Sequence, residues 1–187
     1  MKKNKLFILI SIISINLFVS CFDSSEENKK YIFRYNESSG ITSLDPIFSN
    51  TKSNIWAVNH IFNGLVDLDE NLNIVPSIAK SWKFDEKLLE YRFILRDDVF
   101  FHESDFFEND KKTRRVVASD FIYSFNRIKD DKSSSPGRWV MDYFLDDDPF
   151  QSINDTILII RLKDPFPSII NILAMKYFSV VPKEVVE

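Results

Sequence analysis

Glycine is scarce in this 187-residue chain, which contains only three glycines: Gly40, Gly64 and Gly137. The common phosphate-binding loops need clustered glycines, because a side chain would keep the backbone away from the phosphate. The three glycines are widely spaced, and this spacing excludes a glycine-rich nucleotide-binding loop.

Cysteine and histidine are also rare, with one cysteine, Cys21, and two histidines, His60 and His102. A single cysteine cannot form a disulfide within the chain, and three such side chains are too few for an ordinary zinc site. A catalytic pair of Cys21 with a histidine is disfavoured, because Cys21 follows a segment that reads as a leader. We therefore expect a protein without catalytic activity, cofactor or metal, in which both histidines are structural.

Positive charge is not in excess, because 24 lysines and arginines face 28 aspartates and glutamates and leave a net charge of −4. This balance is poor for binding a nucleic-acid backbone. With 44% hydrophobic and 28% charged residues, the chain can bury a core and differs from a disordered tail. Its length allows one ordinary domain or two small ones.

The first 20 residues have the pattern of a targeting segment. Three lysines precede a mostly apolar stretch, residues 6–19, which serines and an asparagine interrupt. The stretch is shorter than the ~20 apolar residues that a membrane-spanning helix needs. The next residues, 21–30, are mainly polar. We interpret residues 21–30 as a flexible tether.

The sequence Leu-Phe-Val-Ser-Cys at residues 17–21 resembles the processing site of bacterial lipoproteins. The resemblance implies that residues 1–20 are a signal peptide and that Cys21 carries lipid, including palmitate. The protein would then be anchored to the membrane on the periplasmic or extracellular face of a bacterial envelope. Phe18 and Val19 depart from the usual pattern, and the alternative is an ordinary secretory signal with a chance cysteine.

The rest of the chain shows a mixed pattern of short strands and helices. Apolar and polar alternation or short apolar runs predict strands at 31–35, 65–69, 91–96, 99–101, 153–162 and 178–182. Apolar residues at helical spacing predict helices at 53–63, 119–128 and 169–175, with a short helical turn at 75–82. We expect Gly64 to end the first helix, Ser119 to cap the second, and residues 103–115 to form a charged loop.

Seven segments, taken in order, resemble the bacterial extracellular solute-binding proteins of family 5, the oligopeptide-, dipeptide- and nickel-binding components of ABC importers. The segments are 43–46 (Ser-Leu-Asp-Pro), 61–66, 75–82, 91–96 with 99–102, 118–124, 153–156, and 165–167 before 180–183. Three departures fall in turns and at a helix cap: Asp98 replaces a usual glycine, Glu103-Ser104 replaces Asp-Gly, and Val117 replaces threonine.

The resemblance implies an α/β, type 2 periplasmic-binding-protein-like fold, whose two lobes close over a ligand. Residues 31–50 would begin lobe I, residues 51–165 would form an additional domain, and residues 166–187 would return to lobe I. Family members continue well beyond the position of Glu187, so the chain resembles their N-terminal portion.

The resemblance also implies where a ligand would lie. The stretch after Leu-Asp-Pro would run beside a peptide and pair with its backbone: Ser49, Asn50, Thr51 and Lys52. A second contact would come from the residue after Ser-Pro in a later loop, which is Gly137 here, with Trp139 as a substitute aromatic. The alternative is an exposed loop whose tryptophan only packs against the domain.

The expected function is that of a lipid-anchored solute-binding protein that delivers its ligand to ABC permease subunits. A cleft that bonds to the backbone and leaves wet pockets for side chains suits peptides of any sequence. The resemblance does not separate peptide from nickel, haem or sugar ligands. The alternatives are a surface lipoprotein with an adhesive or scaffolding role and a truncated fragment that binds nothing.

Overall fold

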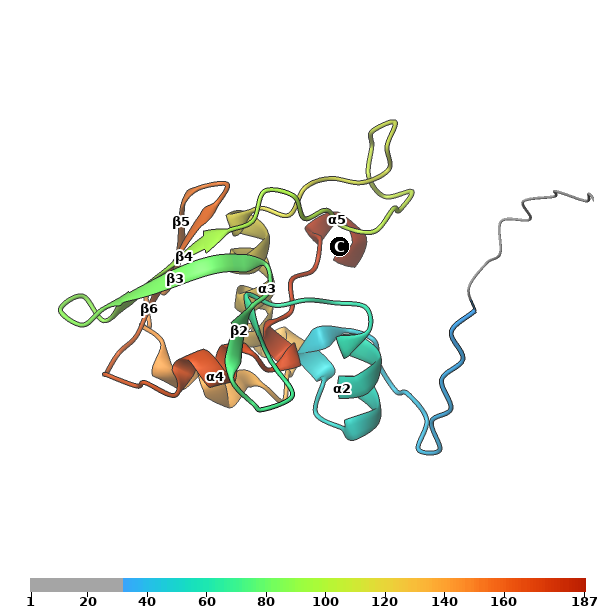
Figure 1. Cartoon of the computed structure of the whole chain (residues 1–187), viewed down its shortest axis with the longest axis horizontal. Coiled ribbons are helices and arrows are strands. Elements are labelled where there is room, and N and C mark those ends of the chain that lie inside the picture. The colour runs from blue at the N-terminus through green and yellow to red at the C-terminus, as the bar shows by residue number, and fades with distance from the viewer. Residues whose placement is uncertain (1–31) are drawn as a thin grey trace, which may run out of the picture. The chain divides into compact units, whose positions relative to one another are not determined.

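An antiparallel sheet and one long helix organise the chain, which the computed structural model describes from residue 32 to residue 187 (Figure 1). Residues 37–187 form one compact unit. The segment 1–20 and Cys21 lie outside the described residues. Residues 32–35 are exposed and form no strand, so the predicted strand at 31–35 is wrong in its described part. Alternation of apolar and polar residues alone therefore does not fix a strand at this segment.

The main sheet has four strands in the order β3-β4-β6-β5, and every neighbouring pair is antiparallel. Its strands are β3 (Ala79–Asp85), β4 (Glu90–Leu95), β5 (Phe150–Asn154) and β6 (Ile157–Arg161). In β4, Tyr91, Phe93 and Leu95 are buried and the residues between them are exposed, because successive side chains point to opposite faces. The strand predicted at 91–96 is confirmed.

Two predictions differ from the structure, one because strand pairing overrides the local pattern and one because of a local turn. The helical turn predicted at 75–82 is wrong: β2 (Ile74–Pro76) pairs with β1 (Val66–Leu68), and β3 begins at Ala79. The strand predicted at 153–162 is confirmed at 157–161 as β6, but its first residues belong to β5 and a turn interrupts it. The Asn154 side-chain oxygen accepts hydrogen bonds from the Thr156 amide at 2.9 Å and its hydroxyl at 3.1 Å, and this local turn separates β5 from β6.

The long helix α3 (Ala118–Lys129) covers one face of the sheet, where it packs against β5 and β6 (Figure 1). Phe121, Phe125 and Ile128 lie on its buried stripe and are fully buried, as the helical spacing at 119–128 predicted. The expected cap by Ser119 is wrong, because Ser119 already lies inside the helix. Asp120 instead accepts a hydrogen bond from the amide of Val117, the residue before the helix, at 2.9 Å.

The remaining helices are short: α2 (Lys52–Asn59), α4 (Ile169–Leu173), α5 (Lys183–Val186) and the 3₁₀ turns η1 (Pro46–Phe48), η2 (Asp131–Ser133), η3 (Arg138–Tyr143) and η4 (Lys176–Phe178). The first predicted helix ends earlier than expected, with His60 as its cap. Gly64 therefore does not cap it and has no positive φ. A side chain at Gly64 would lie 3.4 Å from the Phe178 carbonyl oxygen, so the glycine allows two backbone segments to approach.

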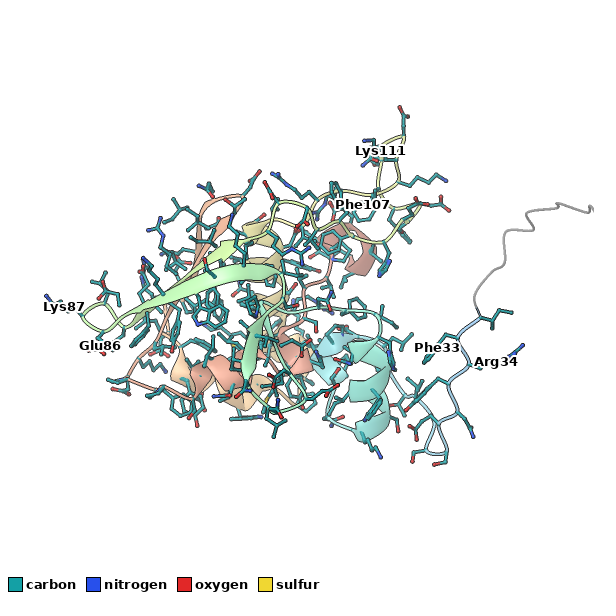
Figure 2. The ribbon with its side chains drawn as sticks, in the orientation of Figure 1. Phe33, Arg34, Glu86, Lys87, Phe107 and Lys111 are labelled. Carbon is teal, nitrogen blue, oxygen red and sulfur yellow. The ribbon has the colours of Figure 1, made fainter. Side chains whose placement is uncertain are left out.

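Two of the predicted short strands do not form as strands, although both segments make backbone hydrogen bonds. Phe100 forms an isolated bridge with Arg115 in place of a strand at 99–101. The segment 178–182 is not a strand, and its Val180 amide donates one hydrogen bond to the Asn63 carbonyl at 3.0 Å. Residues 103–115 form the predicted loop, with Lys111 near its tip, and Glu86 and Lys87 mark the tip of the β3–β4 hairpin (Figure 2).

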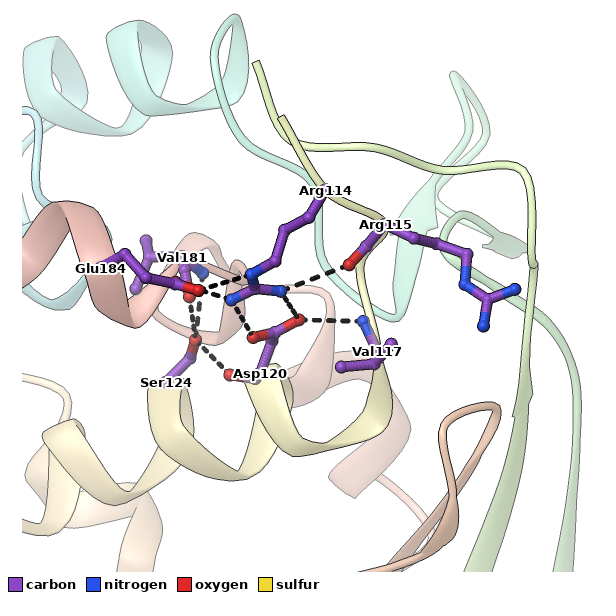
Figure 3. Close-up of polar contacts among 7 residues, drawn as sticks. All are labelled: Arg114, Arg115, Val117, Asp120, Ser124, Val181 and Glu184. Carbon is purple, nitrogen blue, oxygen red and sulfur yellow. Dashed lines mark hydrogen bonds and ion pairs between the residues drawn. The ribbon is translucent and has the colours of Figure 1, made fainter. Parts of the chain in front are cut away.

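Arg114 joins the end of this loop to two distant parts of the chain (Figure 3). Its guanidinium donates to both carboxylate oxygens of Asp120 at 2.8 Å and to both of Glu184 at 2.6 and 2.7 Å. It also lies 5.0 Å from the centre of the Phe101 ring, a cation–π distance. Beside it, the Ser124 hydroxyl accepts a hydrogen bond from the Val181 amide at 3.0 Å. These contacts fasten the segment 181–184 to α3.

The hydrogen bonds from Arg114 lower the pKa of Glu184 below its ordinary value of 4.5 and those with Asp120 and Glu184 raise the pKa of Arg114. A carboxyl group whose pKa is lowered by folding contributes stability above its unfolded-state pKa. The contribution of Glu184 is therefore present at neutral pH and is lost as the pH falls from about 4.5 through the lower, folded-state pKa. Because the Glu184 side chain is 39% exposed, solvent screening keeps this contribution small.

Substitution of Arg114 should test this junction. Arg114→Gln leaves the Asp120 carboxylate, whose side chain is only 7% exposed, without its cation, and we expect a loss of about 3 kcal/mol in the free energy of unfolding. The neighbouring Arg115 points away from the junction (Figure 3) and pairs with the exposed Asp155 at 3.5 Å, so Arg115→Gln should cost under about 1 kcal/mol. Urea titration measures both, and equal losses would contradict the assignment.

Candidate functional site

The first predicted ligand-contact stretch, residues 49–52, follows a turn at residues 45–48. We call this turn the corner, and α3 holds it in place. Asp45 accepts a hydrogen bond from the Ile47 amide at 3.3 Å, and Pro46 begins η1, where its missing N–H costs no helical hydrogen bond. Arg127 on α3 donates to both carboxylate oxygens of Asp45, at 3.1 and 2.5 Å. The Arg127 side chain is mostly buried, so this ion pair fixes the corner to the body of the protein.

Beyond the corner, Thr51 begins α2. Its hydroxyl oxygen accepts a hydrogen bond from the Asn54 amide at 3.3 Å, which makes Thr51 the helix cap. The Asn54 side chain in turn accepts from the Thr42 amide at 3.1 Å and donates to the Phe48 carbonyl at 3.3 Å. These bonds define the backbone path from residue 42 to residue 54.

The four residues predicted to touch a ligand differ in exposure. Asn50, Thr51 and Lys52 are exposed, whereas Ser49 is buried. The Ser49 hydroxyl has no hydrogen-bond partner among residues 32–187. The exposed part of the stretch, residues 50–52, is therefore the part that a ligand could reach.

The second predicted stretch is tied directly to the first corner. The Ser135 hydroxyl donates to the Ile47 carbonyl at 2.7 Å and accepts from the Gly137 amide at 3.2 Å. A buried serine thus brings together two segments that are 88 residues apart in sequence. Ser135 was not predicted from the sequence as a positioning residue. The adjacent Pro136 marks a turn there, but the distant carbonyl partner leaves no signal in the sequence.

Gly137 and Trp139 occupy different environments. A Cβ atom on Gly137 would lie 2.8 Å from the Tyr177 ring, so close packing alone requires a glycine here. Trp139 is 48% exposed and meets Tyr143 edge to face at 6.3 Å between ring centres. Tyr143 stacks on Phe166 at 4.4 Å. The tryptophan is therefore supported from one side and open to solvent on the other.

These features suit binding better than catalysis. The two stretches offer backbone groups, an exposed indole and the cation of Lys52, without a paired acid and base. His60 and His102 are exposed, and within residues 32–187 no three histidine, cysteine or acidic side chains gather into a group that could hold a metal ion. No helix in the same part of the chain is long and apolar enough to cross a membrane. The contacts assigned to Ser49–Lys52, Gly137 and Trp139 remain predictions.

Comparison with known sequences gives relatives that include proteins with peptide-binding names. The chain is 29% identical over 159 residues to the periplasmic murein peptide-binding protein MppA of Escherichia coli, covering 78% of this chain and 28% of MppA. It is 29% identical over 119 residues to the oligopeptide-binding protein AliB of Streptococcus pneumoniae, covering 64% of this chain and 17% of AliB. The chain thus spans less than a third of the length of these relatives.

Comparison with solved structures gives the same fold. The structure of Escherichia coli MppA matches 75% of this chain and 28% of its own, with a TM-score of 0.65 and 27% identity. The oligopeptide-binding protein OppAIV of Borrelia burgdorferi matches 78% of this chain and 30% of its own, with a TM-score of 0.67 and 23% identity. The predicted α/β, periplasmic-binding-protein-like fold is therefore confirmed, and the chain holds part of it.

A protein-family model also matches this chain and identifies its family. The model described as bacterial extracellular solute-binding proteins, family 5, middle region, matches residues 73–186, which include the sheet, α3 and the segment bound to Arg114. The resemblance predicted from the seven sequence segments is thus confirmed. The chain belongs to the bacterial extracellular solute-binding proteins of family 5.

Proposed function

We propose that this chain forms part of a peptide-binding site and serves an ABC importer by handing its ligand to the permease subunits. The observation that carries the proposal is the Ser135–Ile47 hydrogen bond, which joins the segments leading to both predicted ligand-contact stretches. The peptide-binding names of MppA and AliB support the choice of ligand. Because the chain spans 28% of MppA, the activity of a whole importer component is a proposal, and its first requirement is that this chain binds peptide.

The proposed contacts follow from backbone chemistry. Peptides of any sequence share their amide groups, so a protein that accepts many peptides gains affinity from backbone hydrogen bonds. Residues 50–52 are exposed and precede or begin a capped helix. No group within residues 32–187 accepts a hydrogen bond from the Thr51 amide, which would donate to a peptide carbonyl. Trp139 would cover an apolar part of the ligand with its exposed ring face.

We also propose that Cys21 anchors the protein to the membrane through lipid. The support is the Leu-Phe-Val-Ser-Cys pattern at residues 17–21 and the polar run that follows it. Such a tether would let the folded part, residues 37–187, move near a permease at the membrane surface. The lipid-bearing protein would lie on the periplasmic or extracellular side.

Two substitutions test the ligand contacts. Thr51→Pro removes both the helix cap and the amide donor, whereas Thr51→Ala removes only the cap, so only the proline variant should weaken binding beyond the effect of the cap. We expect an additional loss of about fivefold in affinity, close to the 1 kcal/mol of one net hydrogen bond. Trp139→Ala should weaken binding similarly, whereas Trp56→Ala, at a tryptophan of equal exposure on α2, should not. Calorimetric titration with di- to pentapeptides, trialanine first, measures these affinities.

Saturable binding that all four variants leave unchanged would remove both stretches from the site. No binding by any peptide would contradict the proposed function of this chain.

The lipid anchor has an independent test. In cells of a bacterium that processes lipoproteins, radiolabelled palmitate should enter the wild-type chain, and Cys21→Ala should abolish labelling and leave the precursor unprocessed or the protein outside the membrane fraction. Ser20→Ala keeps a small residue before the cysteine and serves as the control that should still be labelled. A wild-type chain that takes up no label would show that Cys21 is not lipidated.

A further inference from the structure

An apolar groove of about 330 Å³ lies apart from the two predicted ligand-contact stretches. It runs between residues 61–63, residues 99–104, which lead into the charged loop, and the segment that ends in α5. None of residues 49–52 or 137–139 lines it. Its volume is at the lower end of the ~300–1,000 Å³ of small-molecule sites, which are mainly apolar with a few polar groups.

The walls of the groove are held by hydrogen bonds and ion pairs on three sides. The Val116 amide donates to the Val99 carbonyl at 2.9 Å, and the Val180 amide donates to the Asn63 carbonyl at 3.0 Å. On the third side Val185 follows Glu184, which Arg114 binds at 2.6 and 2.7 Å. The groove is therefore preformed, and a ligand would not have to order its walls.

The lining is apolar apart from Asn63 and three consecutive residues at 102–104, which we call the rim. Ile61, Phe100 and Val185 keep exposed surface in the groove, with exposed fractions of 39%, 59% and 43%. The rim consists of His102, Glu103 and Ser104, and Glu103 is the only lining residue with a formal charge. Glu103 forms no ion pair with residues 32–187. A carboxylate at the edge of an apolar groove favours an apolar ligand that carries a positive charge.

We propose that this groove binds a small organic cation, an aromatic or branched aliphatic group joined to an ammonium. The hydrocarbon part lies between Ile61, Phe100 and Val185, and the ammonium pairs with the Glu103 carboxylate at the rim. The site is separate from the proposed peptide contacts, because none of residues 49–52 or 137–139 lines it.

Titration with two probes of matched shape and opposite charge tests the proposal. 2-Phenylethylamine should bind the purified chain saturably in the millimolar range, as suits a ligand of its size, and shift the NMR signals of residues 99–104 and 185. 3-Phenylpropionate should bind at least tenfold more weakly, because its carboxylate meets Glu103. Glu103→Gln should reduce this preference for the amine to less than threefold, whereas Glu108→Gln, a carboxylate of the same loop outside the groove, should leave it unchanged.

A second pair of variants tests the apolar part. Phe100→Ala should weaken the amine at least fivefold, and Phe106→Ala, at a phenylalanine of similar exposure outside the groove, should not. Circular dichroism spectra that match the wild type show that each variant is folded. Equal affinity for the two probes, equal effects of Glu103→Gln and Glu108→Gln, or no saturable binding up to about 10 mM would each overturn the proposal. A dimer that forms with rising protein concentration and is abolished by Phe100→Asp would overturn it too, because a second copy would then occupy the groove.

Discussion

The packing of Phe125 against three other rings is the interaction on which the rest of the structure depends. Phe125 is fully buried on α3 and meets Phe121 at 5.8 Å, Phe150 of β5 at 5.2 Å and Phe178 of η4 at 5.1 Å between ring centres, each edge to face. Each such pair contributes roughly 0.5–1.5 kcal/mol beyond the burial of its surface. One side chain thus joins the long helix, the sheet and the C-terminal segment into a single core.

Charged side chains at the edge of this core set the positions of the functional segments. Arg127 holds Asp45 and the corner before Thr51, and Arg114 holds Glu184 beside the groove. Lys176, whose side chain is 10% exposed, pairs with Asp67 at 3.2 Å and ties η4 to the β1–β2 hairpin. Such pairs add little net stability when replaced together, yet removing one partner is costly. They therefore fix geometry more than they stabilise the fold.

How far the sequence predicts the fold depends on where the partner of each segment lies. The helix at 119–128 and the strand at 91–96 are predictable because their own periodicity marks the buried face. The segments 75–82 and 153–162 are not, since pairing with β1 and β4 in one case, and an Asn154 turn in the other, decides their structure. The family could be recognised from ordered short motifs that include Ser-Leu-Asp-Pro at 43–46.

The candidate site was predictable only in part, for the same reason. Residues 49–52 and 137–139 could be proposed from the resemblance, but the Ser135–Ile47 bond spans 88 residues and has no local signature. Gly137 could be proposed as a ligand contact, yet its contact with Tyr177 shows that packing alone accounts for a glycine there. The groove beside Glu103 is assembled from residues far apart in the sequence and follows from the fold alone.

If Phe125 unites helix, sheet and C-terminal segment, their protected amides must open in one step. Native-state hydrogen exchange measures this most directly, at the Leu162 amide bonded to Leu89 and at the Val180 amide bonded to Asn63. The two opening free energies should agree within about 1 kcal/mol and equal that of global unfolding. A Val180 amide that exchanges through an opening of near-zero free energy, while Leu162 stays protected, would show that the C-terminal segment is not part of the common core.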